Sequence, residues 1–222
     1  MFHHHHPYPP FIHSTTEKLI VGTLPPPRFS TGELLERDVD FCYGSYYNSL
    51  WLYIDAIHDI GFRYDNSKEA VRERQKYLWD HKIGICDIVE SANRAKIDAS
   101  DLGMEDIVLR DVIGYLKSYP NIHTLLFTGG NSKNGPEYHF RRHLKDYGKS
   151  LTLVSDEIPR IHQFSLEDEM GDLRNIKTVS LISASGSANR AIGSLPLYRQ
   201  LKSKNPAFNT FDFRVMQYME FL

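Results

Sequence analysis

Four short apolar segments of the chain have the pattern of strands that are buried on both faces. Each is rich in Ile, Val and Leu, and each runs into small or turn-forming residues. They span Lys18–Leu24, Lys82–Val89, Ile122–Gly130 and Lys177–Gly186. Apolar runs of this length are typical of parallel sheets, because helices cover both faces of such a sheet.

Between these segments, apolar residues recur at the spacing of amphipathic helices. The predicted helices cover Ser49–Gly61, Gly103–Tyr119, Gly135–Gly148 and Leu195–Lys204. This alternation predicts an α/β fold, a three-layer α/β/α sandwich with a central, mainly parallel four-stranded sheet. The segment Leu151–Asp172 interrupts the alternation and is expected to add a strand or hairpin. The final segment, Phe211–Leu222, is expected to form an outer helix or strand.

Small and polar residues follow each of the four predicted strands. The loops are Gly22–Ser30, Ile88–Arg94, Phe127–Ser132 and Ser183–Arg190. In open α/β sheets, ligands bind beyond the carboxyl ends of the strands, where such loops meet. The sequence therefore predicts one site built from these four loops.

Composition limits the class of protein. The chain has 222 residues, of which 41% are hydrophobic, and a net charge of −2. We therefore treat 1–222 as a single domain, with 1–16 as an N-terminal arm. The two cysteines, Cys42 and Cys86, exclude a disulfide framework and a four-cysteine metal site, and they fit a cytoplasmic setting. We expect no membrane span, metal or cofactor, and a monomeric protein.

The N-terminal arm contains four consecutive histidines, His3 to His6. They belong either to a native arm or to the remnant of an expression tag. A metal-binding role is disfavoured, because a histidine-rich composition alone fixes no ligand geometry.

Charge is distributed unevenly towards the C-terminus. The stretch Leu173–Phe211 contains no Asp or Glu but six basic residues, Arg190 and Lys202 among them. One interpretation is a solvated helix face. The other is contact with a polyanion, because phosphate neutralisation requires Lys and Arg locally and not a basic protein overall.

Taken in order, the strand-end segments resemble the uracil-DNA glycosylase superfamily. The segment "LIVGTLPPP" resembles its first motif, and "YGSYYNSLW" resembles a Tyr-Gly-His-Pro-x-Asn-x-Phe-Trp signature. The segments "IGICDIVESANR" and "LISASGSANR" resemble a Gly-x-x-Asp-Val segment and the second catalytic motif. Within the superfamily, the resemblance is to the branch of hypoxanthine and uracil DNA glycosylases and to the related mismatch-specific enzymes.

The resemblance implies a monofunctional DNA glycosylase that hydrolyses the N-glycosidic bond of a uracil or hypoxanthine flipped out of DNA. Asn48 matches the catalytic amide, which would orient the attacking water, and Ser183 and Ser185 match the second catalytic motif. The base would be bound by residues of the first motif, the aromatic signature and the third strand. These residues are Gly22, Thr23, Leu24, Tyr43, Gly44 and Thr128. Asn189, Arg190 and Lys202 would contact DNA.

Several of these residues have a second interpretation. Asn48 precedes a predicted helix and is also suited to cap it. Tyr43 is either a stacking platform for the base or a core aromatic. Leu24, Thr128 and Ile182 replace Asn, Asn and Pro of relatives, which favours the alternative of a catalytically impaired DNA-binding protein of the same fold. A small-molecule enzyme is disfavoured, because "GGNSKNG" is no known nucleotide fingerprint.

Overall fold

The computed structural model describes residues 1–98, 100–167 and 171–222, and it is built around a six-stranded mixed sheet. The strand order is β3-β2-β6-β9-β8-β7. The strands are β2 (Lys18–Gly22), β3 (Ile83–Asp87), β6 (Thr124–Phe127), β7 (Thr152–Ser155), β8 (Arg160–Glu167) and β9 (Leu173–Ser180). The four predicted strands correspond to β2, β3, β6 and β9, which are parallel neighbours.

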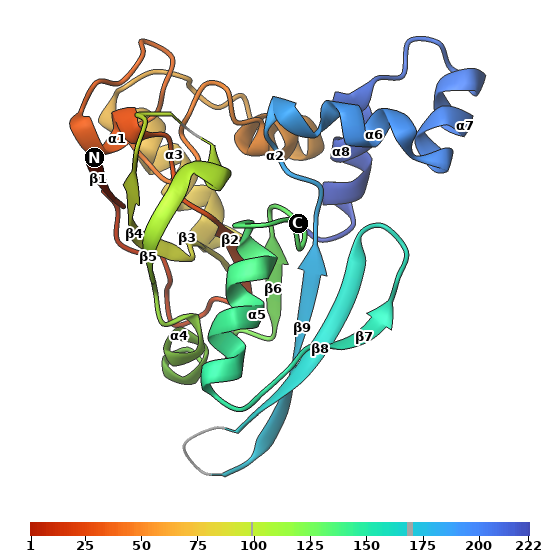
Figure 1. Cartoon of the computed structure of the whole chain (residues 1–222). Helices are drawn as coiled ribbons and strands as arrows, with labels where there is room; N and C mark the ends of the chain where they lie inside the picture. The colour runs from red at the N-terminus through yellow and green to blue at the C-terminus, as the bar shows by residue number, and fades with distance from the viewer. Residues whose placement is uncertain (99, 168–170) are drawn as a thin grey trace.

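The prediction of a four-stranded sheet is wrong, because two further strands extend it. The expected hairpin after Leu151 forms β7 and β8, and β8 pairs antiparallel with β9 from Arg160 to Glu167. Buried and exposed side chains alternate along β8, as in a strand covered on one face only. In Figure 1, β8 and the start of β9 extend beyond the layers that cover the rest of the sheet.

A smaller antiparallel sheet, in the order β1-β4-β5, joins the N-terminal arm to the centre of the chain. It contains β1 (Phe2–His5), β4 (Val89–Arg94) and β5 (Met104–Leu109). The predicted helix Gly103–Tyr119 is therefore wrong in its first half. The helix α4 (Val112–Ser118) begins only where Asp111 accepts a hydrogen bond from the Gly114 amide at 2.9 Å.

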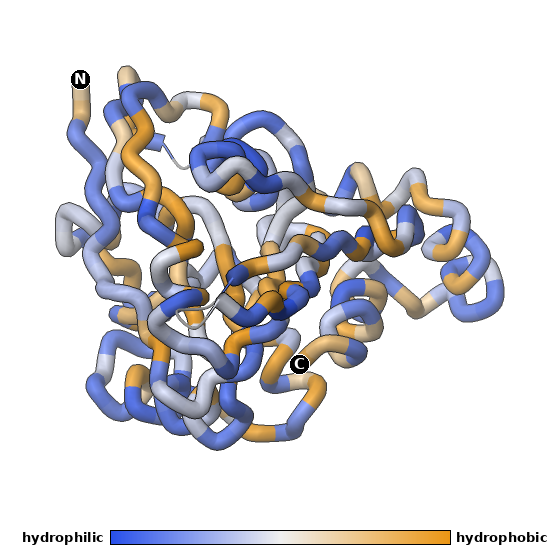
Figure 2. The backbone as a smooth tube through the Cα atoms, turned by 90° about the horizontal axis from the view of Figure 1, so that it is seen from below, coloured by the Kyte–Doolittle hydropathy of each residue, from blue (hydrophilic) through white to orange (hydrophobic). Residues whose placement is uncertain are grey.

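Helices cover both faces of the large sheet. On one face α2 (Leu50–His58), α3 (Lys68–Asp80) and α8 (Thr210–Met219) share a core with Ile20, Ile85 and Val179. On the other face, α4 and α5 (Pro136–Asp146) share a core with the neighbouring strand residues Val21 and Cys86. Figure 2 shows the hydrophobic stretches gathered in the interior. The three layers confirm the predicted architecture, although α3 was not predicted.

Short helices occupy the connections. They are α1 (Pro27–Thr31), η1 (Asp101–Gly103), η2 (Gly186–Ala188), α6 (Asn189–Ser194) and α7 (Pro196–Lys204). The pair α6 and α7 projects from the molecule, next to α8 (Figure 1). No helix within the described ranges 1–98, 100–167 and 171–222 has the length and apolar character needed to cross a membrane.

Candidate functional site

The carboxyl end of β2 is a point where side chains from three other segments converge. A Cβ atom at Gly22 would lie 2.1 Å from the Tyr43 hydroxyl oxygen and 2.3 Å from Asp87 Oδ1. Position 22 therefore accepts only glycine, because any larger residue would displace a phenol or a carboxylate. Thr128, which follows β6, completes the group through a 3.0 Å hydrogen bond between its hydroxyl and that of Tyr43.

Tyr43 fills the strand-end crevice. Its side chain is only 8% exposed, and burial raises the pKa of its phenol. Its backbone lies in the left-handed region, with φ of 58°, which a non-glycine residue adopts at a cost. The expected base platform is thus a ring packed in the core, and its polar end faces Gly22 and Thr128.

Asp87 ends β3 and is held by the N-terminal arm. Its Oδ2 atom lies 2.8 Å from Nε2 of His6, and both residues are buried. The backbone N–H of Tyr8 donates to Nδ1 of His6 at 3.1 Å. In the neutral ring the proton is therefore on Nε2, and this nitrogen donates to Asp87. Neither residue was among the predicted site residues, although Asp87 lies in the segment "IGICDIVESANR" and His6 in the histidine run of the N-terminal arm.

A second carboxylate, that of Asp101, lies near the same strand ends. The Thr23 hydroxyl donates to Asp101 Oδ2 at 3.4 Å. Burial raises the pKa of Asp101 to about 6; Arg94 opposes this shift and the charge of Asp87 adds to it. Leu24, the next residue after Thr23, packs at the edge of the hydrophobic core.

Asn48 combines a helix-start role with a backbone contact to the loop after β9. Its side-chain Oδ1 accepts a hydrogen bond from the Leu50 amide at 3.0 Å, so the side chain supports the start of α2. Its backbone forms a β-bridge with Ser185, and the Ser49 amide donates to the Ala184 carbonyl at 3.1 Å. Two motifs that are far apart in the sequence are therefore adjacent.

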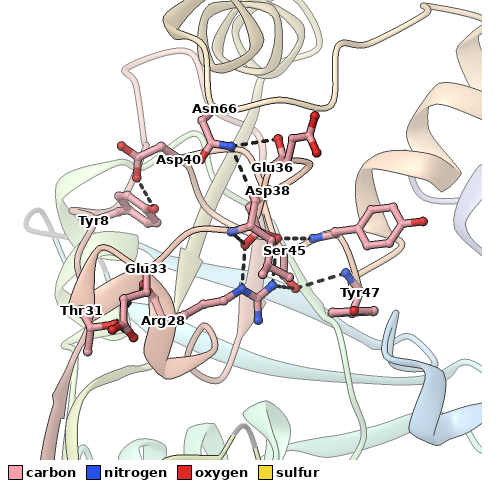
Figure 3. A network of polar contacts seen from close by, with 12 residues as sticks. Tyr8, Arg28, Thr31, Glu33, Glu36, Asp38, Asp40, Ser45, Tyr47 and Asn66 are labelled. Atoms are coloured by element: carbon pink, nitrogen blue, oxygen red, sulfur yellow. Dashed lines mark hydrogen bonds and ion pairs between the residues drawn. The ribbon is translucent and has the colours of Figure 1, made fainter.

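A buried ion pair holds the loop that carries Asn48. Both oxygens of the fully buried Asp38 accept hydrogen bonds from Arg28, at 2.6 and 2.8 Å, and Arg28 also donates to Ser45 (Figure 3). Burial alone would raise the pKa of Asp38, but hydrogen bonds from Arg28 and from the amides of Tyr46 and Leu35 lower it. This network fixes the backbone immediately before Asn48.

A cavity opens on the outer side of this loop. Tyr43, Gly44 and Asn48 contribute to its wall, together with Tyr46 and Trp51. The expected base-binding residues therefore lie at two places. Tyr43 and Gly44 line this cavity, whereas Gly22 and Thr128 lie next to the Tyr43 hydroxyl at the end of β2.

The loop after β9 is held by one face of the C-terminal helix α8. The Ile182 amide donates to Gln217 Oε1 at 2.7 Å, and the Tyr218 hydroxyl donates to the Ile182 carbonyl at 2.8 Å. Arg214 donates to the Ser185 carbonyl at 3.0 Å and to Asn189 Oδ1 at 2.8 Å. These contacts fix the segment that contains Ser183 and Ser185. The sequence signal was the spacing of three polar residues on one helix face.

We compared the chain with known proteins. Neither the scan against protein-family models nor the search of curated proteins gave a match. The search of solved structures found the solution NMR structure of a putative uracil DNA glycosylase from Methanosarcina acetivorans. The alignment covers 96% of each chain, with a TM-score of 0.51 and 19% sequence identity. The chain has a uracil-DNA-glycosylase-like fold.

The uracil-DNA-glycosylase-like fold places the predicted site residues in two groups. Asn48 and Ser185 lie side by side, and Gly22, Tyr43 and Thr128 meet in the crevice. Arg190 and Lys202 lie apart from these groups, exposed on α6 and α7. In the described part of the chain, no group of three or more His, Cys, Asp or Glu side chains is arranged to hold a metal ion.

Proposed function

We propose that the protein is a DNA glycosylase that acts on a deaminated base, uracil or hypoxanthine, flipped out of DNA. The observation that carries the proposal is the pairing of Asn48 with Ser185. It joins the two segments that resemble the catalytic motifs of the superfamily.

The proposed reaction needs little chemistry from the protein beyond orientation and charge. The leaving base carries negative charge, which the backbone amides of Thr23 and Leu24 would stabilise as oxyanion-type donors. Asn48 would orient the attacking water, and Ser183 and Ser185 would hold the sugar and the neighbouring phosphate. A base entering the crevice would displace the Tyr43 hydroxyl from Thr128, and Gly44 would then allow the loop to approach the base closely.

The acid-free segment supplies the proposed DNA surface. Arg190 and Lys202 are exposed on the projecting pair α6 and α7, close in sequence to Asn189. Contacts from such side chains to phosphates position a protein on DNA without reading its sequence.

Two substitutions at Asn48 test the proposal. Asn48→Ala removes the amide and the hydrogen bond to Leu50, whereas Asn48→Asp keeps an oxygen acceptor for that bond. We expect base release from uracil- or hypoxanthine-containing duplexes to fall by about 100-fold or more in Asn48→Ala, as when an oriented catalytic group is lost, and by less in Asn48→Asp, which keeps an oxygen that can orient water. DNA affinity should change little.

The controls separate catalysis from helix capping. If folded Asn48→Ala released base at the wild-type rate, Asn48 would be a structural residue. If the wild-type protein gave no abasic product on any of these duplexes even in excess, the proposed enzyme function would be wrong.

A catalytically impaired DNA-binding protein is the second candidate. Leu24 packs at the edge of the core in place of a water-orienting amide, and the Tyr43 ring occupies the crevice. This function predicts salt-dependent DNA binding without abasic product.

A further inference from the structure

Arg74 of α3 is a fully buried cation whose hydrogen bonds are incomplete. It is 0% exposed, and its Nη1 atom donates to the Ala70 carbonyl at 2.8 Å. In the described part of the chain, its Nε and Nη2 atoms have no acceptor. Burial lowers the pKa of Arg74, but a guanidinium keeps its charge at neutral pH. A buried charge without a counter-ion is costly, so this arginine needs an explanation beyond packing.

Three aromatic rings surround the guanidinium without supplying an acceptor. Its central carbon Cζ lies 5.3 Å from the ring centroid of Trp51, 5.1 Å from that of Phe62 and 5.0 Å from that of Tyr64. Ring faces attract a cation, but the N–H groups in the plane of the guanidinium still need oxygen acceptors. The rings therefore stabilise the charge in part and leave two donor atoms unpaired.

The nearby carboxylates are engaged elsewhere. Glu73 pairs with Arg63 at 3.1 Å, and Asp55 Oδ1 accepts a hydrogen bond from the Gly61 amide at 2.7 Å. Burial outweighs the charges of these acids in its effect on the pKa of Arg74. Within the described residues, the chain thus supplies no counter-ion that is hydrogen-bonded to this guanidinium.

The cavity on the outer side of the loop that carries Asn48 has Arg74 in its wall. Its volume is about 130 Å³, whereas about 10–15 Å³ suffices for one water. Of the described residues that line it, two are arginines, Arg37 and Arg74, and none is Asp or Glu. Asn48 Oδ1 accepts from the Leu50 amide, which leaves Nδ2 as a further donor. The cavity has both the room and the donors for an anion.

Arg28 shows, in the same molecule, what this edge of a guanidinium binds. Its Nε and Nη2 atoms donate to the two oxygens of Asp38, at 2.6 and 2.8 Å (Figure 3). The same two atoms are the ones without an acceptor in Arg74. They form a planar fork whose spacing matches two oxygens of a carboxylate or a phosphate.

We propose that this cavity is a binding site for a phosphate-class oxyanion, held bidentately by Nε and Nη2 of Arg74. Arg37 lines the same cavity and adds a second positive charge. Two guanidinium charges match a phosphate dianion, whereas a carboxylate would balance only one of them. The oxyanion is either free phosphate or a phosphate group of bound DNA. Binding requires no base excision, so the inference goes beyond the proposed glycosylase function.

Thermal unfolding in the absence of DNA tests the site. For a Kd of about 1 mM, about 20 mM sodium phosphate should raise the Tm of the wild type by about 4 °C over sodium chloride of equal ionic strength. Arg74→Met keeps a long side chain without the fork and should lose this shift. Without phosphate, the variant should be at least as stable as the wild type, because it removes an unpaired buried charge.

Arg72→Met is the matched control on α3, because the Arg72 side chain is 71% exposed. This variant should keep the full phosphate shift. The absence of a shift in the wild type would overturn the inference. An equal shift in Arg74→Met would overturn it as well, because phosphate would then bind at another surface.

The fluorescence of Trp51 keeps the test decisive if Arg74→Met folds poorly. The chain has two tryptophans, so Trp79→Phe leaves Trp51, whose ring lies against Arg74, as the reporter. Phosphate should change the emission of this protein along a saturable curve, with the same Kd as in thermal unfolding. An emission that does not respond to phosphate would count against the site.

Competition separates the two sources of the oxyanion. If a phosphate of DNA occupies the site, inorganic phosphate at constant ionic strength should weaken duplex binding to the wild type more than to Arg74→Met. If the free ion occupies it, phosphate should weaken duplex binding equally in both proteins. Either result is compatible with the site and assigns its ligand.

Failure of the proposed function has a different signature. A wild type that releases no base but shows the phosphate shift dependent on Arg74 would disprove the glycosylase alone. An active glycosylase without this shift would disprove the phosphate site alone.

Discussion

The phenol of Tyr43 and the carboxylate of Asp87 meet at one point because Gly22 has no side chain. Three strands contribute to this point, through Gly22, Asp87 and Thr128, and a loop contributes Tyr43. The resulting cluster is buried, so each polar group in it needs a partner or carries an energetic cost. Single substitutions here should therefore have measurable effects on stability as well as on binding.

Asp101 gives a prediction for the dependence of stability on pH. Its pKa is about 6 in the folded protein, against an ordinary value of 3.8 for an aspartate. Between these values the folded state binds more protons, so the free energy of unfolding falls as pH rises from about 4 to about 6. Asp101→Asn should remove this fall and stabilise the protein at pH 7 by about 2 to 3 kcal/mol.

Urea unfolding of both proteins at pH 4 and pH 7 measures this difference. The two proteins should differ far less at pH 4, where the carboxyl is protonated in the folded state and about half protonated in the unfolded state. A variant less stable than wild type at pH 7 would contradict a raised pKa.

At the residue scale, the sequence predicted Asn48 and Gly22 because each lies in a local motif. It missed the contact between His6 and Asp87, whose positions are 81 apart along the chain. It left open whether Tyr43 is a stacking platform or a core aromatic, because a left-handed φ at a tyrosine has no local sequence signal. Long-range contacts of this kind are set by the fold.

At the element scale, the largest error was the helix expected over Gly103–Tyr119. Ile107, Val108 and Val112 have helical spacing, but the first half of the segment pairs with β4 as a strand. The strand includes Asp106 with φ of 47°, a conformation that a helix excludes. Tertiary pairing outweighed the local pattern, whereas the four parallel strands were predicted because continuous apolar runs indicate burial directly.

The hydrogen bonds between α8 and the loop after β9 give a second prediction. Gln217→Leu would leave the Ile182 amide without its acceptor. We expect a loss of about 1–3 kcal/mol in the free energy of unfolding, the usual cost of an unsatisfied buried group. Faster hydrogen exchange across residues 182–189 should accompany it.

Met216 is a matched control on the same helix, because its side chain is 41% exposed. Met216→Gln should change the free energy of unfolding by no more than about 0.5 kcal/mol. Equal effects of the two substitutions would show that α8 supports the fold generally and does not hold the loop.

At the scale of the whole molecule, charge is distributed unevenly along the chain. The net charge is −2, yet the projecting α6 and α7 lie in a stretch without acidic residues. If DNA binds there, Arg190→Ala and Lys202→Ala should each weaken binding and reduce the slope of log affinity against log salt by about one.

Lys145 is the control for that measurement. It is exposed in the last turn of α5, which follows β6 and runs back towards the amino ends of the parallel strands. Lys145→Ala should leave both affinity and salt slope unchanged. A smaller slope in this variant would place the DNA elsewhere on the surface.

The hydrogen bonds between α8 and the loop after β9 also affect how the protein folds during its synthesis on the ribosome. The parallel strands β2, β3, β6 and β9 are complete once Ser180 has emerged, but the residues that hold the following loop, Arg214, Gln217 and Tyr218, are translated only afterwards. Because synthesis proceeds from the N-terminus, the sheet strands are available before the residues that hold this loop. A truncated messenger RNA, or cleavage of the chain before Thr210, would therefore give a chain that has the sheet strands but lacks the hydrogen bonds that hold the loop.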